Sequence, residues 1–243
     1  MNNIVNIGFL LLALLAEIIG TIGGFGSSVF FVPIANFYFD FQTVLGLTAL
    51  FHLSSNLSKI GLFRKGINKR LIMYMGIPAI VFVIIGGILT HYFDSKILEL
   101  SLSIFLISLS LLFIVKPKLK INDGNKEAVV GGVLSGFLAG FLGTGGAVRG
   151  LTMAAFNLEK SVFIATSAFI DFGVDFSRTV VYFFNGYIQK SELIYIPFLF
   201  LIGFVGTYIG KRVLTKISQE RFKLYSLILI FIIGIVTLIG VYY

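Results

Sequence analysis

The chain has 243 residues, of which 57% are apolar and only 12% are charged, with 27 Phe and 27 Gly. This composition excludes an ordinary soluble domain. The formal net charge of +8 comes from Lys and Arg in short connections between apolar runs. Nucleic-acid binding needs a clustered basic face with stacking aromatics, so we expect no nucleic-acid partner.

Apolar runs recur along the whole chain, without the alternation that is typical of β-barrel strands. Seven of the ten runs reach or exceed the roughly 17–20 residues that cross a bilayer as helix. Backbone polar groups in lipid must be paired within the element, so the sequence predicts an all-α integral membrane protein, multi-pass in the cell membrane. We expect the first run to be retained as a helix, since it lacks a basic start and a cleavage site. The runs lie at 4–23, 27–37, 43–63, 71–93, 97–115, 128–142, 147–158, 161–184, 193–210 and 222–243.

The sequence matches itself at a shift of about 120 residues. A G-x-x-G-x-x-G motif occurs in both halves, and the helix that follows it carries equivalent polar positions. The pairs include Gly20, Gly23 and Gly26 with Gly140, Gly143 and Gly146, and His52, Asn56 and Lys59 with Asp171, Asp175 and Arg178. We therefore predict two membrane repeats, 1–122 and 123–243, within one membrane domain.

Charge placement predicts that the two halves are inverted relative to each other. The connection at 64–70 carries four Lys or Arg, whereas its counterpart at 184–191 carries one. The next pair of connections reverses this bias, with Lys96 near 92–99 against five basic residues at 211–223. By the positive-inside rule, 64–70, 116–127 and 211–223 are cytoplasmic and the termini lie outside.

Each repeat is predicted to hold about four to five helical segments. The segment after each glycine motif is short, roughly 11 to 12 residues, and cannot span the bilayer comfortably. We expect short or broken helices that meet near the middle of the membrane.

Two interpretations of the glycine motifs are open. One is close helix packing, because small residues let backbones approach in lipid. The other is a helix break whose following N-terminus presents N–H donors and a positive dipole end to a small anion. The breaks predict a substrate site that includes Gly23, Gly26, Ser27, Ser28, Gly143, Gly145 and Gly146.

Arg149 lies in the first turn after the second break, where a cation is unfavourable without a compensating anion. The compensating charge is either a substrate or one of Asp171 and Asp175. Snorkelling of Arg149 to the outer headgroups is the alternative.

The polar triplets His52, Asn56, Lys59 and Asp171, Asp175, Arg178 each follow an i, i+4, i+7 spacing and form one stripe on a helix. Such a stripe points into the bundle or into a wet cavity. We count Asn56, Lys59 and Arg178 among the substrate-binding candidates, although Lys59 lies near a helix end and snorkelling is equally compatible with it.

Asp175 and Arg178 are three residues apart and can neutralise each other. Asp171 has no local partner, and a carboxylate buried there is suited to proton coupling because desolvation disfavours its charged form. The alternative is a static pair with Arg149. Glu17, Asp175 and His52 are further proton-coupling candidates. The two histidines lack metal-ligand spacing, so the sequence predicts no metal and no cofactor.

The stretches GTIGGFGSSVFFVPIANF and SGFLAGFLGTGGAVRGLTMAAFNLEKSVFIATSAFID, which begin at Gly20 and Ser135, resemble the sulfite exporter family known as TauE/SafE. The resemblance covers nearly the whole chain. It implies a permease with two internal repeats that carries sulfite or an organosulfonate.

We therefore expect a secondary transporter of a small anion, a sulfur oxyanion or organosulfonate, bound at the repeat interface and coupled to protons. Its partners are the anion and the lipid bilayer, and a homo-oligomer is left open. The alternative is an ion channel or a structural membrane subunit, and an intramembrane enzyme is the least favoured reading.

Overall fold

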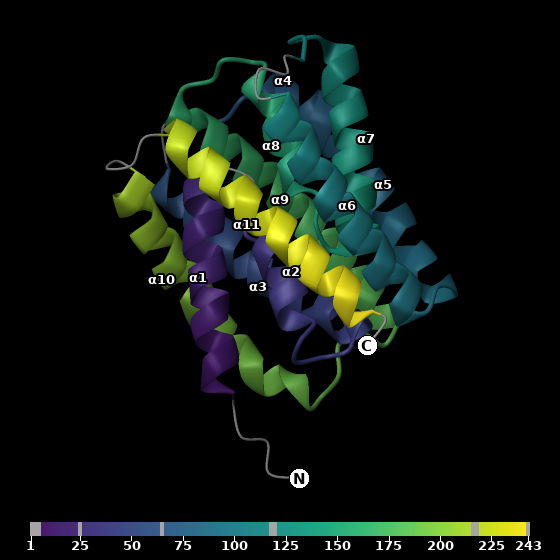
Figure 1. Cartoon of the computed structure of the whole chain (residues 1–243). Coiled ribbons are helices and arrows are strands. Elements are labelled where there is room, and N and C mark those ends of the chain that lie inside the picture. Colours follow the sequence, from purple (N-terminus) through teal and green to yellow (C-terminus); the bar gives the residue numbers. More distant parts are fainter. Residues whose placement is uncertain (1–5, 24–25, 64–65, 117–120, 215–218, 242–243) are drawn as a thin grey trace.

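The computed structural model describes residues 6–23, 26–63, 66–116, 121–214 and 219–241, which are helical with short connections and contain no strand (Figure 1). The predicted all-helical fold is confirmed for this part of the chain. Some residues used in the sequence argument lie outside the described residues. These are part of the first glycine motif at 24–25, Arg64 and Lys65, part of the linker at 117–120, and Lys216.

The first half forms five helical segments in its described residues. Asp40 and Asp94 start two of them, because each carboxylate accepts a hydrogen bond from a backbone amide three residues later. The fourth segment is composite and contains a π-helical turn. The elements are α1 (Ile7–Gly23), α2 (Ser28–Ala35), α3 (Phe41–Leu62), then α4 (Lys69–Leu71), η1 (Ile72–Gly76), α5 (Ile77–Leu89) and η2 (Thr90–Tyr92) as one segment, and α6 (Ser95–Val115).

The second half repeats this order. Helix α7 ends at Gly143, whose φ of 74° is the left-handed conformation that commonly closes a helix. The elements are α7 (Asn125–Leu142), α8 (Gly146–Ala154), α9 (Lys160–Phe184), η3 (Glu192–Tyr195) with α10 (Ile196–Leu214), and α11 (Gln219–Gly240). The short helices α2 and α8, of 8 and 9 residues, confirm the predicted short segments.

The main helix contacts join one half to the other. Helix α5 packs against α7, α1 against α10, α3 against α9, and α6 against α11. Helix α11 crosses one face of the molecule diagonally, over α1 and α2 (Figure 1). One buried apolar cluster runs from Phe9 to Ile230, so the halves share a core.

Three glycines on α7 bring its backbone against α5. A Cβ atom on Gly132 would overlap the carbonyl oxygen of Met75 in η1, and one on Gly136 or Gly140 would overlap that of Ala79 or Val83 in α5. The interpretation of the second glycine motif as a packing surface is therefore correct for Gly140, the last of three glycines spaced by four on α7.

The described parts of three connections that the sequence predicts to be cytoplasmic lie at one end of the molecule. Arg70 donates a hydrogen bond from Nε to Asn125 Oδ1 at 2.6 Å, and Lys211 Nζ donates to the Leu62 carbonyl at 2.8 Å. At the other end, Gln189 donates to Thr43 and Ser95 donates to Gln42. The connections 66–70, 121–124 and the end of α10 are thus separated from 92–95 and 185–191.

Among the residues that the structure describes, three helical stretches are long and apolar enough to cross a membrane, namely Lys69–Tyr92, Ser95–Val115 and Glu192–Val213, and the shorter helices Ile7–Ile22 and Leu227–Gly240 are also apolar. Many large apolar side chains on these helices face outward, among them Leu11, Leu15, Leu111 and Phe200. A broad apolar outer surface on a buried polar centre is typical of a protein in lipid.

Candidate functional site in the bundle centre

The two helix breaks meet in the centre of the bundle. Gly26, with φ of 80°, precedes α2, and a Cβ on it would lie 3.5 Å from Gly146 Cα at the start of α8. Ser28 Oγ donates a hydrogen bond to Thr144 Oγ1 at 3.2 Å. The structure therefore brings together the two breaks that the sequence predicts in separate halves.

No side chain caps α2 or α8 at the residue before the helix, Ser27 or Gly145. The first-turn amides of a helix have no partner within that helix, so both starts present donors and a positive dipole end to the centre. Gly145 itself packs against the Ser135 carbonyl, a position where a side chain does not fit.

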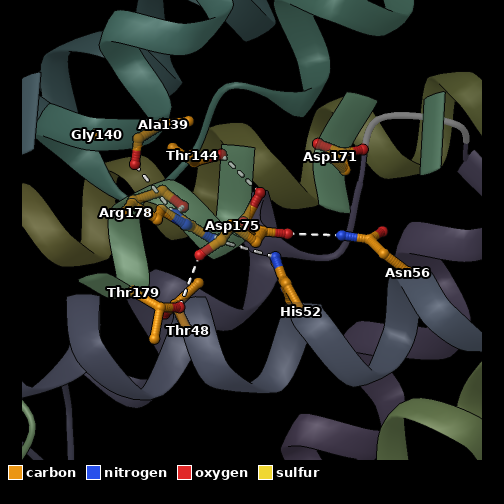
Figure 2. Close-up of polar contacts among 12 residues, drawn as sticks. Thr48, His52, Asn56, Ala139, Gly140, Thr144, Asp171, Asp175, Arg178 and Thr179 are labelled. Atoms are coloured by element: carbon orange, nitrogen blue, oxygen red, sulfur yellow. Dashed lines mark hydrogen bonds and ion pairs between the residues drawn. The ribbon is translucent and has the colours of Figure 1, made fainter. Parts of the chain in front are cut away.

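A buried ion pair lies where α3 crosses α9. Arg178 Nη2 is 2.7 Å from Asp175 Oδ1, and Asn56 Nδ2 donates to Asp175 Oδ2 at 2.6 Å. Figure 2 shows His52 and Asn56 on α3 pointing toward Asp175 and Arg178 on α9. The predicted neutralisation of Asp175 by Arg178 is present.

Arg178 also caps the end of α7. Its Nη1 donates to the carbonyls of Ala139 at 3.0 Å and Gly143 at 2.9 Å. A helix end buried in the bundle needs such donors for its last carbonyls. The Arg178 side chain is 2% exposed, and its guanidinium pairs with Asp175 and donates to the end of α7.

His52 connects this pair to α1 through Ser27. Arg178 Nη2 lies 3.5 Å from His52 Nδ1, and a guanidinium only donates, so Nδ1 is the acceptor. His52 Nε2 then carries the hydrogen and donates to Ser27 Oγ at 3.1 Å, while Ser27 Oγ donates to Glu17 Oε2 at 2.5 Å. This directionality identifies a neutral imidazole.

Glu17 is fully buried and accepts hydrogen bonds from three helices and from Ser27, which precedes α2. Lys59 Nζ is 2.9 Å from its Oε1, which also accepts from three hydroxyl groups. The hydroxyl donors are Thr21 at 3.1 Å, Ser55 at 2.5 Å and Thr207 at 2.9 Å, on α1, α3 and α10. Lys59 therefore pairs with a carboxylate instead of snorkelling, and its side chain is 12% exposed.

A second ion pair lies beside the breaks. Arg149 Nη2 donates to Asp171 at 2.5 Å, and Arg149 Nε donates to Ser167 Oγ at 3.2 Å. Arg149 is 4% exposed and Asp171 is 20% exposed. Asp171 is thus the anion that compensates Arg149 in this structure, and Arg149 does not snorkel.

A cavity of about 40 Å³ lies next to this ion pair, with room for about three water molecules. Its wall combines the first break with two of the charged groups. The lining residues are Gly20, Thr21, Gly26, Lys59, Phe163, Ile164, Ser167, Ala168 and Asp171.

The cavity contains only part of the predicted site. Gly26, Lys59 and Asp171 line it, whereas Asn56, Asp175 and Arg178 form the buried α3–α9 pair. Gly143, Gly145 and Gly146 pack against protein atoms at the end of α7 and the start of α8, and Gly23 ends α1.

Sequence reasoning missed four hydroxyl residues in this region, Thr21, Ser55, Ser167 and Thr207. Thr21 and Ser167 lie one helical turn from Glu17 and Asp171, a spacing that marks side chains on one face. Ser55 and Thr207 reach Glu17 from other helices, so nothing local indicates them. In the described residues no group of three or more His, Asp or Glu is placed to hold a metal ion.

Comparison with known proteins agrees with this architecture. The family model described as "Sulfite exporter TauE/SafE" matches residues 9–237. A protein of Methanocaldococcus jannaschii named as a probable membrane transporter is 27% identical over 239 residues, which is 88% of each chain. The family match, the apolar helices and the polar centre identify the protein as a membrane transporter that belongs to the TauE/SafE sulfite exporter family.

Proposed function

We propose that the protein is a secondary transporter of a small sulfur oxyanion or organosulfonate, multi-pass in the cell membrane. The observation that carries this proposal is the central cavity, in which the Gly26 break lies beside Lys59 and Ser167. A small anion fits this combination of an ammonium group, hydroxyl donors and nearby helix N-termini. The name of the family supports a sulfur-containing anion as the cargo.

The two halves are inverted repeats in this proposal. The most extensive helix contacts have counterparts when the halves are exchanged, since α5 with α7 corresponds to α10 with α1, and α3 with α10 corresponds to α9 with α5. The connection after α3 and its equivalent after α9 also lie at opposite ends of the molecule. Both observations support a two-fold relationship with the substrate at the repeat interface.

Transport is coupled to protons in this proposal. Four titratable side chains gather around the breaks, namely Glu17, His52, Asp171 and Asp175. Ionisable groups in a membrane interior are costly and mark ion pathways or proton relays.

The proposal is tested with purified protein in proteoliposomes loaded with radiolabelled sulfite or with a labelled sulfonate. We expect flux well above that of protein-free vesicles. Lys59→Gln removes the cation that lines the cavity and should reduce flux about tenfold or more, because a charge-assisted contact contributes about 1.5–3 kcal/mol. Lys190→Gln, an exposed loop lysine, is the matched control and should leave flux unchanged.

Equal flux with and without protein, for both classes of anion, would refute a sulfur-anion transporter. Flux that survives Lys59→Gln would keep the transport function and move the anion away from this cavity.

A further inference from the structure

The Asp171 carboxylate lies between the cavity and Arg149. Asp171 and Ser167 line the cavity, and each accepts a hydrogen bond from the Arg149 guanidinium. The side chain of Asp171 is 20% exposed, against 4% for Arg149. An anion that enters the cavity therefore meets the carboxylate before it can reach the guanidinium.

The charges that face Asp171 are balanced in this structure. Helix α8 contributes Arg149, which Asp171 neutralises, and α3 contributes Lys59, which Glu17 of α1 neutralises. Asp175 and Arg178 follow on α9 itself and neutralise each other, and His52 of α3 is neutral. An incoming anion thus adds an uncompensated negative charge beside Asp171.

The repulsion is large at contact distance. Repulsion between two like charges about 4 Å apart near a protein surface lowers the binding constant of the anion about a thousandfold, relative to binding beside a neutral group. One proton on Asp171 removes this repulsion, leaves the Arg149 charge free to bind the anion, and provides an O–H donor toward the cavity.

The other titratable groups are less suited to this exchange. Glu17 and Asp175 are 0% and 3% exposed, and both oxygens of each carboxylate already accept from protein donors. His52 has Arg178 on one ring nitrogen and Ser27 on the other. Asp171 is the group of these four that lines the cavity.

We propose that the anion and one proton bind together, with the proton on the Asp171 carboxylate and the anion on the Arg149 guanidinium that Asp171 releases. This inference rests on the proposed transport function. Binding forms one O–H bond from a solvent proton, and release returns that proton on the same side as the anion. The cycle is symport, and for a monoanion it moves no net charge.

The experiment uses labelled methanesulfonate, because a sulfonate keeps a single negative charge across the range studied and its own titration does not contribute. Flux and affinity are measured in proteoliposomes at several values between about pH 5 and about pH 8, a range that lies above the ordinary pKa of exposed carboxyl groups and includes that of imidazole. For the wild-type protein we expect the apparent affinity to rise by up to about tenfold for each unit that the pH falls. A dye trapped in the vesicles should report lumen acidification that accompanies methanesulfonate entry.

Asp171→Asn mimics the protonated acid and should abolish both the pH slope and the acidification while the anion still moves. Asp171→Glu keeps a titratable group and should retain the slope, which separates coupling from a folding defect. Asp123→Asn, an exposed loop acid, is the matched control and should behave as the wild-type protein.

A pH slope that persists in Asp171→Asn would overturn the inference and leave the transport function standing. Anion transport by the wild-type protein with no pH slope would also overturn the inference and leave the transport function standing. If the wild-type protein moves neither sulfite nor methanesulfonate at any pH, the proposed function and the inference fail together.

Discussion

The Arg178 guanidinium lies 2.7 Å from the Asp175 carboxylate at the crossing of α3 and α9, and each of the two side chains is at most 3% exposed. The same guanidinium holds the last carbonyls of α7. Arg178 therefore joins α9 directly to the end of α7. It also reaches α3 through Asp175, which accepts a hydrogen bond from Asn56. A buried pair of this kind is costly to break from one side.

Arg178→Ala should destabilise the protein by about 3–5 kcal/mol, because it leaves Asp175 as a buried charge without its cation. Thermal unfolding of the detergent-solubilised protein measures this loss. Arg178→Ala combined with Asp175→Ala removes both charges and should regain part of the stability. If Arg178→Ala unfolds at the wild-type temperature, the pair and the α7 cap carry no structural role.

Glu17 and Lys59 should be energetically coupled across the α1–α3 contact. Glu17→Gln leaves Lys59 without its carboxylate, and Lys59→Gln leaves the buried Glu17 without its cation. The double variant should lose less stability than the sum of the single variants, with a coupling energy of about 1–3 kcal/mol. Unfolding of the four proteins gives this energy, and additive losses would show that the two groups act independently.

Gly136→Ala should destabilise the protein, because its Cβ would overlap the Ala79 backbone on α5 and force α5 and α7 apart. We expect a loss of about 1–3 kcal/mol, as for other overpacked interfaces. Gly61→Ala on α3 is the matched control, since a Cβ there meets nothing within 4 Å. It should be neutral or gain up to about 1 kcal/mol from helix propensity. Equal effects of the two changes would contradict the close α5–α7 contact.

The topology can be checked directly, because the chain has no cysteine and single-cysteine variants need no further changes. Asn122→Cys lies at the end with the basic connections, and Lys190→Cys lies at the opposite end. An impermeant thiol reagent added to intact cells should label Lys190→Cys and spare Asn122→Cys until the membrane is opened. Labelling of both variants in intact cells would contradict the inverted arrangement.

The short helices and one ion pair could be predicted because their causes are local. The apolar runs after the glycine motifs are short in the sequence itself, and Asp175 and Arg178 are neighbours on one helix. The glycine motif was ambiguous for a physical reason. Gly140 serves packing against α5, whereas Gly143 three residues later serves a left-handed turn, so one motif contains both roles.

The partners of Lys59 and Arg149 were harder to predict. Lys59 shares a helix stripe with His52 and Asn56, but its flexible stem reaches Glu17 on α1, a helix that periodicity on α3 cannot locate. For Arg149 the sequence left a substrate, Asp171 and Asp175 as choices. Only the packing of α8 on α9 places Asp171 within reach.

The glycine stripe on α7 has a mechanical consequence. It holds α7 at backbone distance from the segment that contains α5, and Gly206 and Gly210 of α10 leave room for the side chains of Glu17 and Thr21 on α1. Each of these two helix couples takes one helix from either half, so in the proposed transport cycle the units that move as one body are couples of helices from both halves. The cavity is lined by residues of α1, α3 and α9 and by Gly26, so α1 is the one member of the two couples that borders it.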